Sequence, residues 1–197
     1  PLLITHGWPG SVLEYLDILD ALTDPTQHGG SPDDAFHVVL PALPGFGFSS
    51  KPRDTGTGVP KIAALWETLM HRLNYTAFHA HGGDWGSIVT QAVLLQEETA
   101  CTAGHCTLPI VLPDETTLSD PQPAELDALE SFQFYNDWDS GYSKQQSTRP
   151  QTLGYGLADS PSGQMAWVVE KIARWMDCER SRVRRPENVL PKDPLQD

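Results

Sequence analysis

One aspartate with glycines on both sides is the feature of this chain that most directly indicates chemistry. Asp84 lies in the run His-Gly-Gly-Asp-Trp-Gly of residues 81–86. Small flanking residues let the backbone turn sharply, and such a turn between a strand and a helix lifts the central side chain above the sheet edge. A carboxylate held there attacks an sp3 carbon without a general base and forms a covalent ester. The alternative interpretation is an aspartate that only caps the following helix.

The segments around Asp84 are suited to position it in this way. Residues 75–80 predict a short strand before the turn. Residues 87–96 carry apolar side chains at helical spacing and predict a helix after it. A strand, a tight turn and a helix are the context of a nucleophile elbow, with aspartate in place of the usual serine. The substrates that fit an aspartate nucleophile are strained or carry a good leaving group, as epoxides and haloalkanes do.

A second motif lies at the start of the chain, where the apolar strand 1–5 leads into His6-Gly7-Trp8-Pro9-Gly10. Together with the run around Asp84, this motif resembles the α/β-hydrolase-fold epoxide hydrolases of the microsomal and juvenile-hormone type. In that family two backbone N–H groups form the oxyanion hole, and the resemblance places them at Trp8 and Trp85. It also implies that both tryptophans wall the substrate pocket and that the peptide bond before Pro9 is cis.

A third motif supports the same resemblance. Ser140-Gly141-Tyr142, followed by Thr148-Arg149-Pro150-Gln151-Thr152 and Leu157-Ala158-Asp159-Ser160-Pro161, is similar to the cap of these epoxide hydrolases. A cap tyrosine of the family hydrogen-bonds the epoxide oxygen, and the matching position is Tyr142. A phenol with a pKa of about 10 stays protonated at neutral pH, yet it donates a strong hydrogen bond to a developing alkoxide. Without the resemblance, Tyr142 would be interpreted as a residue that anchors a cap helix. We interpret Tyr135 and Tyr155 as packing residues.

The rest of the chain predicts the fold in which these motifs lie. We expect an α/β architecture: an α/β-hydrolase core with a mostly parallel, incomplete sheet over residues 1–113, and a helical cap over residues 114–197. Alternating strands and amphipathic helices indicate the core. Its further predicted elements are a helix that Ser11 caps, a buried strand at 36–40, a helix at 59–73 and a strand at 102–108. In the cap, helices are predicted at 124–138 and 162–177, and no strand is expected.

The histidine and the acid that complete the family's reaction are not expected in this chain. Hydrolysis of an ester needs a water molecule activated by a histidine that a carboxylate holds. Seven histidines are present, and we assign structural roles to all of them: His6 to the oxyanion motif, His81 to a local hydrogen bond before the elbow, and the remaining five to loops, strands and helices. Because the family's leading and final strands are also missing, we predict that this chain alone does not turn over.

The composition of the chain limits the classes of partner and cofactor that we expect it to bind. A net charge of −13 over 197 residues disfavours nucleic acid and anionic membranes. Cys101, Cys106 and Cys178 form no metal-type or disulfide-type pattern, so we expect neither a metal nor a cofactor. No stretch is long enough for a transmembrane helix, which favours a cytoplasmic protein, although an N-terminal anchor or leader would lie outside this sequence. The oligomeric state and the preferred epoxide do not follow from the sequence.

These observations predict an epoxide hydrolase that acts on a small apolar epoxide and water. Asp84 opens the epoxide to an ester, and hydrolysis of that ester yields a vicinal diol. Two alternatives remain open. A haloalkane dehalogenase uses the same elbow, with an indole such as that of Trp85 to bind halide, but Tyr142 argues against it because halide needs no proton. A catalytically silent remnant that binds apolar ligands agrees with the missing histidine and acid.

Overall fold

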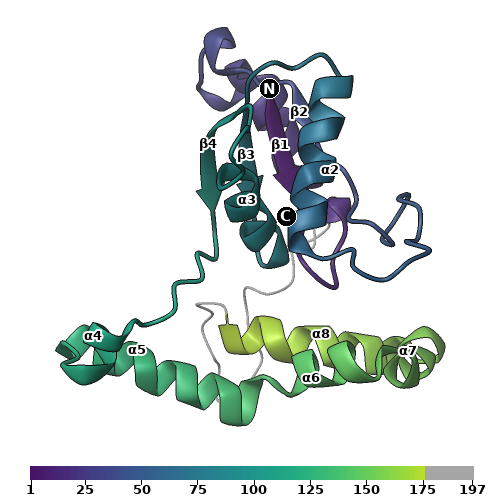
Figure 1. The fold of residues 1–197 in the computed structure, drawn as a ribbon. Coiled ribbons are helices and arrows are strands. Elements are labelled where there is room, and N and C mark those ends of the chain that lie inside the picture. Colours follow the sequence, from purple (N-terminus) through teal and green to yellow (C-terminus); the bar gives the residue numbers. More distant parts are fainter. Residues whose placement is uncertain (176–197) are drawn as a thin grey trace. The chain divides into compact units, whose positions relative to one another are not determined.

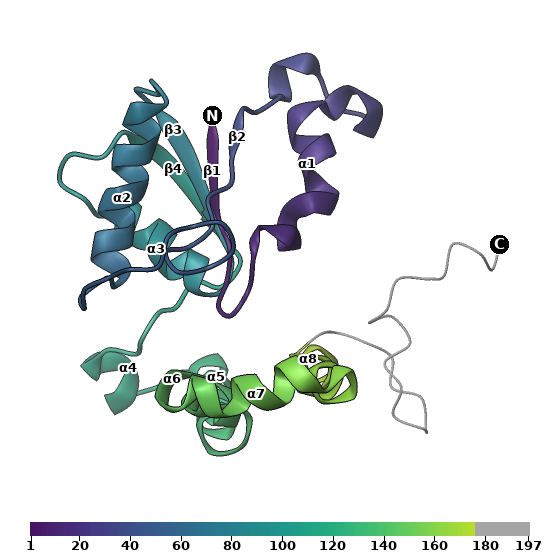
Figure 2. The same ribbon diagram turned by 90° about the vertical axis from the view of Figure 1, so that its right-hand side faces the viewer.

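A computed structural model describes residues 1–175 of the protein, and the chain divides into two units (Figures 1 and 2). The first unit is Pro1–Leu112, and the second begins at Pro113. Cys178 and the last two residues of the helix predicted at 162–177 lie outside the described residues. Among residues 1–175, no helix is both long enough and apolar enough to cross a lipid bilayer.

A parallel sheet of four strands forms the centre of the first unit. Its strands are β1 (Leu2–Thr5), β2 (Val38–Val39), β3 (Phe78–Gly82) and β4 (Cys101–Cys106), in the order β2-β1-β3-β4. The predicted α/β class with a parallel sheet is confirmed. Two details of the prediction were wrong. β2 is a two-residue, half-buried edge strand rather than the buried strand expected at 36–40, and β3 runs up to the turn at Gly82 instead of ending at 80.

Helices cover both faces of this sheet (Figure 2). On one face lie α2 (Val59–Arg72) and α3 (Trp85–Leu94), which pack against each other. On the other face, the 3-10 turn η1 (Val12–Tyr15) continues into α1 (Leu16–Thr23), and the short 3-10 turns η2 (Pro25–His28) and η3 (Pro32–Asp34) follow. The apolar core lies between the sheet and the α2–α3 pair. Its most buried members are Leu3, Met70, Phe78, Val89 and Val93.

In residues 113–175, the described part of the second unit, all the regular elements are helical. Its elements are α4 (Glu115–Ser119), α5 (Pro123–Phe134), the π-helical turn η4 (Tyr135–Asp139), α6 (Gly141–Thr148), α7 (Pro150–Asp159) and α8 (Pro161–Trp175). The helix predicted at 124–138 is therefore divided, because the π turn replaces its last segment. Helix α7 packs against both α6 and α8.

Candidate active site

The turn between β3 and α3 has the backbone geometry of a nucleophile elbow. Asp84 adopts a φ of 51° and a ψ of −125°, a conformation that residues other than glycine rarely adopt. The neighbouring glycines leave no room for a side chain. A Cβ atom on Gly82 would overlap the carbonyl of Gly86, and a Cβ on Gly86 would overlap the carbonyl of Thr5. The close approach of three backbone segments therefore forces the strained residue into one position.

The side chain of Asp84 does not cap α3, although Asp84 occupies the capping position of that helix. Its Oδ1 instead accepts a hydrogen bond from the backbone N–H of Trp8 at 2.7 Å. The two residues are 76 positions apart in the chain, so this bond joins the loop after β1 to the elbow after β3. The carboxylate is held by the loop that the motif His6–Gly10 forms, as a nucleophile beside an oxyanion hole would be.

Trp8 and Trp85 lie together at this carboxylate. Trp85 is the first residue of α3, so its N–H has no acceptor within the helix. The two indole rings contact edge to face, with 6.3 Å between their centroids, and the Trp85 residue is 43% exposed. The peptide bond between Trp8 and Pro9 is cis, as the resemblance implied. The structure thus brings together three of the four predicted site residues.

Two residues that the sequence analysis left unassigned hold the loop in place. Glu14 accepts hydrogen bonds from the N–H of Ser11 at 3.0 Å and from the N–H of Gly7 at 3.4 Å. The Ser-x-x-Glu spacing of residues 11–14 is the signature of a capping box and could have identified Glu14. Tyr15 donates from its buried hydroxyl to the carbonyl of Thr5 at 3.3 Å. Burial raises the pKa of Tyr15, an effect that the hydrogen bond with the Gly83 backbone partly opposes.

None of the seven histidines hydrogen-bonds the Asp84 carboxylate, and all seven lie within the described residues. His6 is fully buried, and both of its ring nitrogens are engaged. Because the N–H of Leu43 donates to its Nε2 at 2.9 Å, the proton of the neutral ring is on Nδ1, which donates to the Gly7 carbonyl at 2.7 Å. This bonding gives His6 a structural role in the loop.

The remaining predicted site residue, Tyr142, belongs to helix α6 of the second unit. Its hydroxyl lies 3.3 Å from the hydroxyl of Tyr135, and its ring meets Trp175 edge-on with 5.2 Å between centroids. Lys171 Nζ lies 5.7 Å from the centre of the same ring. The sequence analysis did not predict this contact between the hydroxyls of Tyr135 and Tyr142. The seven-residue separation of the two tyrosines, two helical turns, was the available signal.

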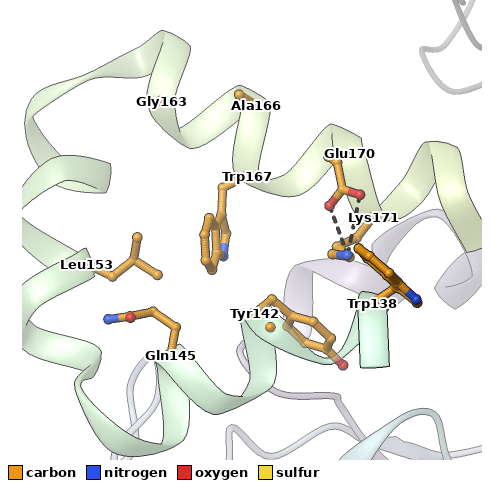
Figure 3. A pocket seen from close by; sticks show the side chains of 10 residues that line it. Trp138, Tyr142, Gln145, Leu153, Gly163, Ala166, Trp167, Glu170 and Lys171 are labelled. Carbon is orange, nitrogen blue, oxygen red and sulfur yellow. Dashed lines mark hydrogen bonds and ion pairs between the residues drawn. The ribbon is translucent and has the colours of Figure 1, made fainter. Parts of the chain in front are cut away.

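Tyr142 lies at the edge of a hollow of about 700 Å³ within the second unit. In Figure 3, Trp167 lies in the middle of the lining residues, with Leu153 and Gln145 on one side of it and Tyr142, Trp138 and the Glu170–Lys171 ion pair on the other. The Nε1–H of Trp167 is directed to Gln146 Oε1 at 3.0 Å, which fixes that indole. The position of Tyr142 relative to Asp84 stays a prediction, because the two residues belong to different units.

Comparisons with known proteins identify the family of this chain. A family model described as alpha/beta hydrolase fold matches residues 1–153. The chain belongs to the α/β-hydrolase family. It is 49% identical over 197 residues to a "Putative epoxide hydrolase" of Stigmatella aurantiaca, covering 100% of this chain and 44% of that relative. Across the curated relatives, this α/β hydrolase spans somewhat under half of the longer protein.

Two solved structures of epoxide hydrolases are also similar to this α/β hydrolase. An epoxide hydrolase of Aspergillus niger superposes with a TM-score of 0.73 at 32% identity, over 89% of this chain and 46% of the other. The juvenile hormone epoxide hydrolase of Bombyx mori superposes with a TM-score of 0.62 at 32% identity, over 89% of this chain and 39% of the other. The resemblance to epoxide hydrolases that the three motifs predicted is confirmed.

The described part of this α/β hydrolase contains no cluster that suits a strongly held metal ion. Among residues 1–175, no group of three His, Cys, Asp or Glu side chains converges on one point. Cys101 and Cys106 are both free thiols. Burial raises the pKa of Cys101, so this thiol stays protonated at neutral pH.

Proposed function

We propose that Asp84 performs the first half of an epoxide hydrolase reaction by attacking an epoxide carbon. One observation supports this proposal most directly. The Asp84 carboxylate does not cap α3, and it accepts a hydrogen bond from the Trp8 N–H at 2.7 Å. Since that N–H engages Oδ1, Oδ2 is the oxygen that attacks. A bond forms between Oδ2 and carbon, the carbon–oxygen bond of the epoxide breaks, and its electron pair remains on the departing oxygen.

Tyr142 supports the departing oxygen in this proposal. Opening of the ring develops alkoxide charge, and a phenol proton transferred to that oxygen neutralises it. The neighbouring hydroxyl of Tyr135, 3.3 Å away, is placed to donate a hydrogen bond to the phenolate that results. Aromatic and aliphatic side chains dominate the hollow beside Tyr142, which suits a small apolar epoxide.

The second half of the reaction, hydrolysis of the ester to a vicinal diol, uses the same N–H groups. A tetrahedral intermediate places negative charge on Oδ1, where Trp8 already donates and Trp85 offers a second N–H. Water attack needs a general base. All seven histidines lie at or before residue 105, and none bonds to Asp84. We therefore propose that the 197-residue chain by itself stops at the ester.

The intact mass of the purified chain after incubation with styrene oxide tests this proposal. We expect one adduct per chain, no adduct for Asp84→Asn, and an adduct that forms about 100-fold or more slowly for Tyr142→Phe. Asp114→Asn is the matched control, because Asp114 caps a helix through its bond from the Thr117 N–H at 2.8 Å. An adduct that persists in Asp84→Asn, or none in the parent chain, would contradict the proposal.

Halide release measured on the same proteins distinguishes the two alternatives. A haloalkane dehalogenase would release halide from 1-bromobutane faster than it consumes styrene oxide. A silent binding protein would retain an apolar fluorescent ligand in Asp84→Asn and form no adduct with either substrate. Faster adduct formation with the epoxide than with the haloalkane, lost in Asp84→Asn, supports the epoxide hydrolase.

A further inference from the structure

Two histidines from neighbouring strands of the first unit meet side by side. His81 of β3 and His105 of β4 are register partners, and their Nδ1 atoms lie 2.9 Å apart. The rings are nearly parallel, with 23° between their planes and 5.0 Å between centroids. His81 is half-buried under the Tyr15 ring, and His105 is exposed on β4, the edge strand (Figure 1). Within the described residues, neither imidazole hydrogen-bonds the Asp84 carboxylate, and the pair is in contact with the Asp84 loop only through Tyr15.

We propose that His81 and His105 form a two-imidazole chelating site for a divalent transition-metal ion that prefers right-angled coordination, such as Ni²⁺ or Cu²⁺. Imidazole nitrogens bind such ions at about 2.0–2.1 Å. Two ligands at a right angle to each other are then about 2.9 Å apart. This is the separation of the two Nδ1 atoms in the structure. A tetrahedral ion such as Zn²⁺ would require about 3.3–3.4 Å and a movement of one ring.

Binding needs a change of tautomer and a rotation of the rings, because the two Nδ1 atoms now point toward each other as hydrogen-bond partners. At 2.9 Å, one Nδ1 now carries a proton and the other accepts it. When an ion binds, both Nδ1 lone pairs face the metal, and both neutral rings carry their proton on Nε2. Because no third His, Cys, Asp or Glu converges with the pair among residues 1–175, water completes the coordination and the ion stays exchangeable.

Three other exposed histidines of the first unit are less suited to chelation. His79 lies on β3 two residues before His81, and its Nδ1 contacts the Thr102 hydroxyl at 3.2 Å. His28 and His71 each pair with a single carboxylate, at 3.1 Å and 3.2 Å respectively. The pair of imidazoles across β3 and β4 therefore offers a geometry that none of these provides. A bound ion would tie the edge strand β4 to β3.

Calorimetric titration of the full chain with nickel chloride in a non-coordinating buffer tests the site, and nickel avoids the oxidation of thiols by copper. We expect one Ni²⁺ per chain, bound more tightly than Zn²⁺, and a higher melting temperature with Ni²⁺ present. His81→Gln and His105→Gln should each lower the affinity more than about tenfold, since even outer-shell partners of a metal contribute that much. His79→Gln is the matched control and should leave binding unchanged.

Three results would overturn the proposal: no Ni²⁺ binding to the parent chain, binding that survives both His81→Gln and His105→Gln, or an equal loss in His79→Gln. Circular dichroism without metal establishes that each variant is folded. If His81→Gln does not fold, His105→Gln decides the question, because His105 is exposed on the edge strand. The test is independent of activity toward epoxides.

Discussion

The two units hold their candidate catalytic residues by different means. In the first unit, backbone constraints fix Asp84: a positive φ, two glycines that admit no side chain and an N–H from a distant loop. In the second unit, side-chain contacts with Tyr135, Trp175 and Lys171 fix Tyr142.

The two units also differ in how many of their apolar side chains are buried. The first unit has a continuous apolar core that includes Met70 and Phe78, both almost fully buried. Among residues 113–175, only the polar Ser140 and Gln146 are buried, and Trp138 is 77% exposed. The comparison indicates that substitutions in the first unit should act on folding and chemistry together, whereas substitutions in the second should act mainly on the local site.

The largest contrast is expected between two glycine substitutions. Gly86→Ala places a Cβ against the carbonyl of Thr5 and should destabilise the first unit by more than about 4 kcal/mol. Gly156→Ala, in helix α7, meets nothing within 4 Å and should stabilise the second unit by about 0.5–1 kcal/mol. Hydrogen exchange resolved by peptide measures both, with faster exchange expected in β3 and α3 of Gly86→Ala. Similar exchange in both variants would contradict the comparison.

A smaller contrast is expected between a core residue and an exposed aromatic residue. Met70→Ala empties a fully buried position between the sheet and α2 and should destabilise the first unit by about 3 kcal/mol. Trp138→Ala removes a mostly exposed ring and should change stability by less than about 0.5 kcal/mol. Urea unfolding followed by far-UV circular dichroism gives the two values. Equal losses in both variants would show that the second unit has a core of comparable weight.

Removal of the loop support should have an intermediate effect. Glu14→Ala deletes the acceptor of the Ser11 and Gly7 N–H groups and should lower stability by about 1 kcal/mol. Because those bonds shape the loop that carries the Trp8 N–H, formation of the styrene oxide adduct should slow as well. Ser31→Ala removes a second capping box, remote from Asp84, and is the control that should change stability alone. An unchanged adduct rate in Glu14→Ala would separate the loop from the chemistry.

The smallest effect concerns acid stability. Burial, with a smaller contribution from His105, holds the pKa of His81 below its ordinary value, so the folded protein binds fewer protons than the unfolded chain. Stability is therefore retained above the unfolded pKa of about 6.5 and falls as the pH drops below it. The titratable groups that face His81 are His105 of β4 and Tyr15 of η1. His81→Gln should flatten the urea midpoint between pH 7.5 and pH 5.5; an unchanged slope would contradict this assignment.

Much of the first unit could be predicted because short sequence motifs determine where its helices, strands and turns begin and end. The glycines around Asp84, the Ser11 cap and the apolar spacing of α2 each predicted an element that the structure contains. Contacts between residues on neighbouring strands could not be predicted from the sequence. The contact of His81 with His105 depends on strand register and on the irregularity after Phe78, which sequence periodicity does not reveal.

The second unit was harder to predict for a related reason. Gly154 and Gly156 lie within α7, which begins at Pro150. Because glycine has a low helix propensity, the sequence of this segment does not indicate a helix. The π-helical turn at Tyr135–Asp139 interrupts a segment whose composition predicts one continuous helix. Neither feature follows from intrinsic helix propensity.

We propose that the first unit presents Asp84 as a nucleophile and does not use it as a helix cap. Tandem mass spectrometry of the digested chain after alkylation by styrene oxide is the most direct test, because this measurement identifies the residue that carries the adduct. We expect an ester on Asp84 that is absent from Asp84→Asn. Modification at Cys101, Cys106 or a histidine, with Asp84 unmodified, would contradict it.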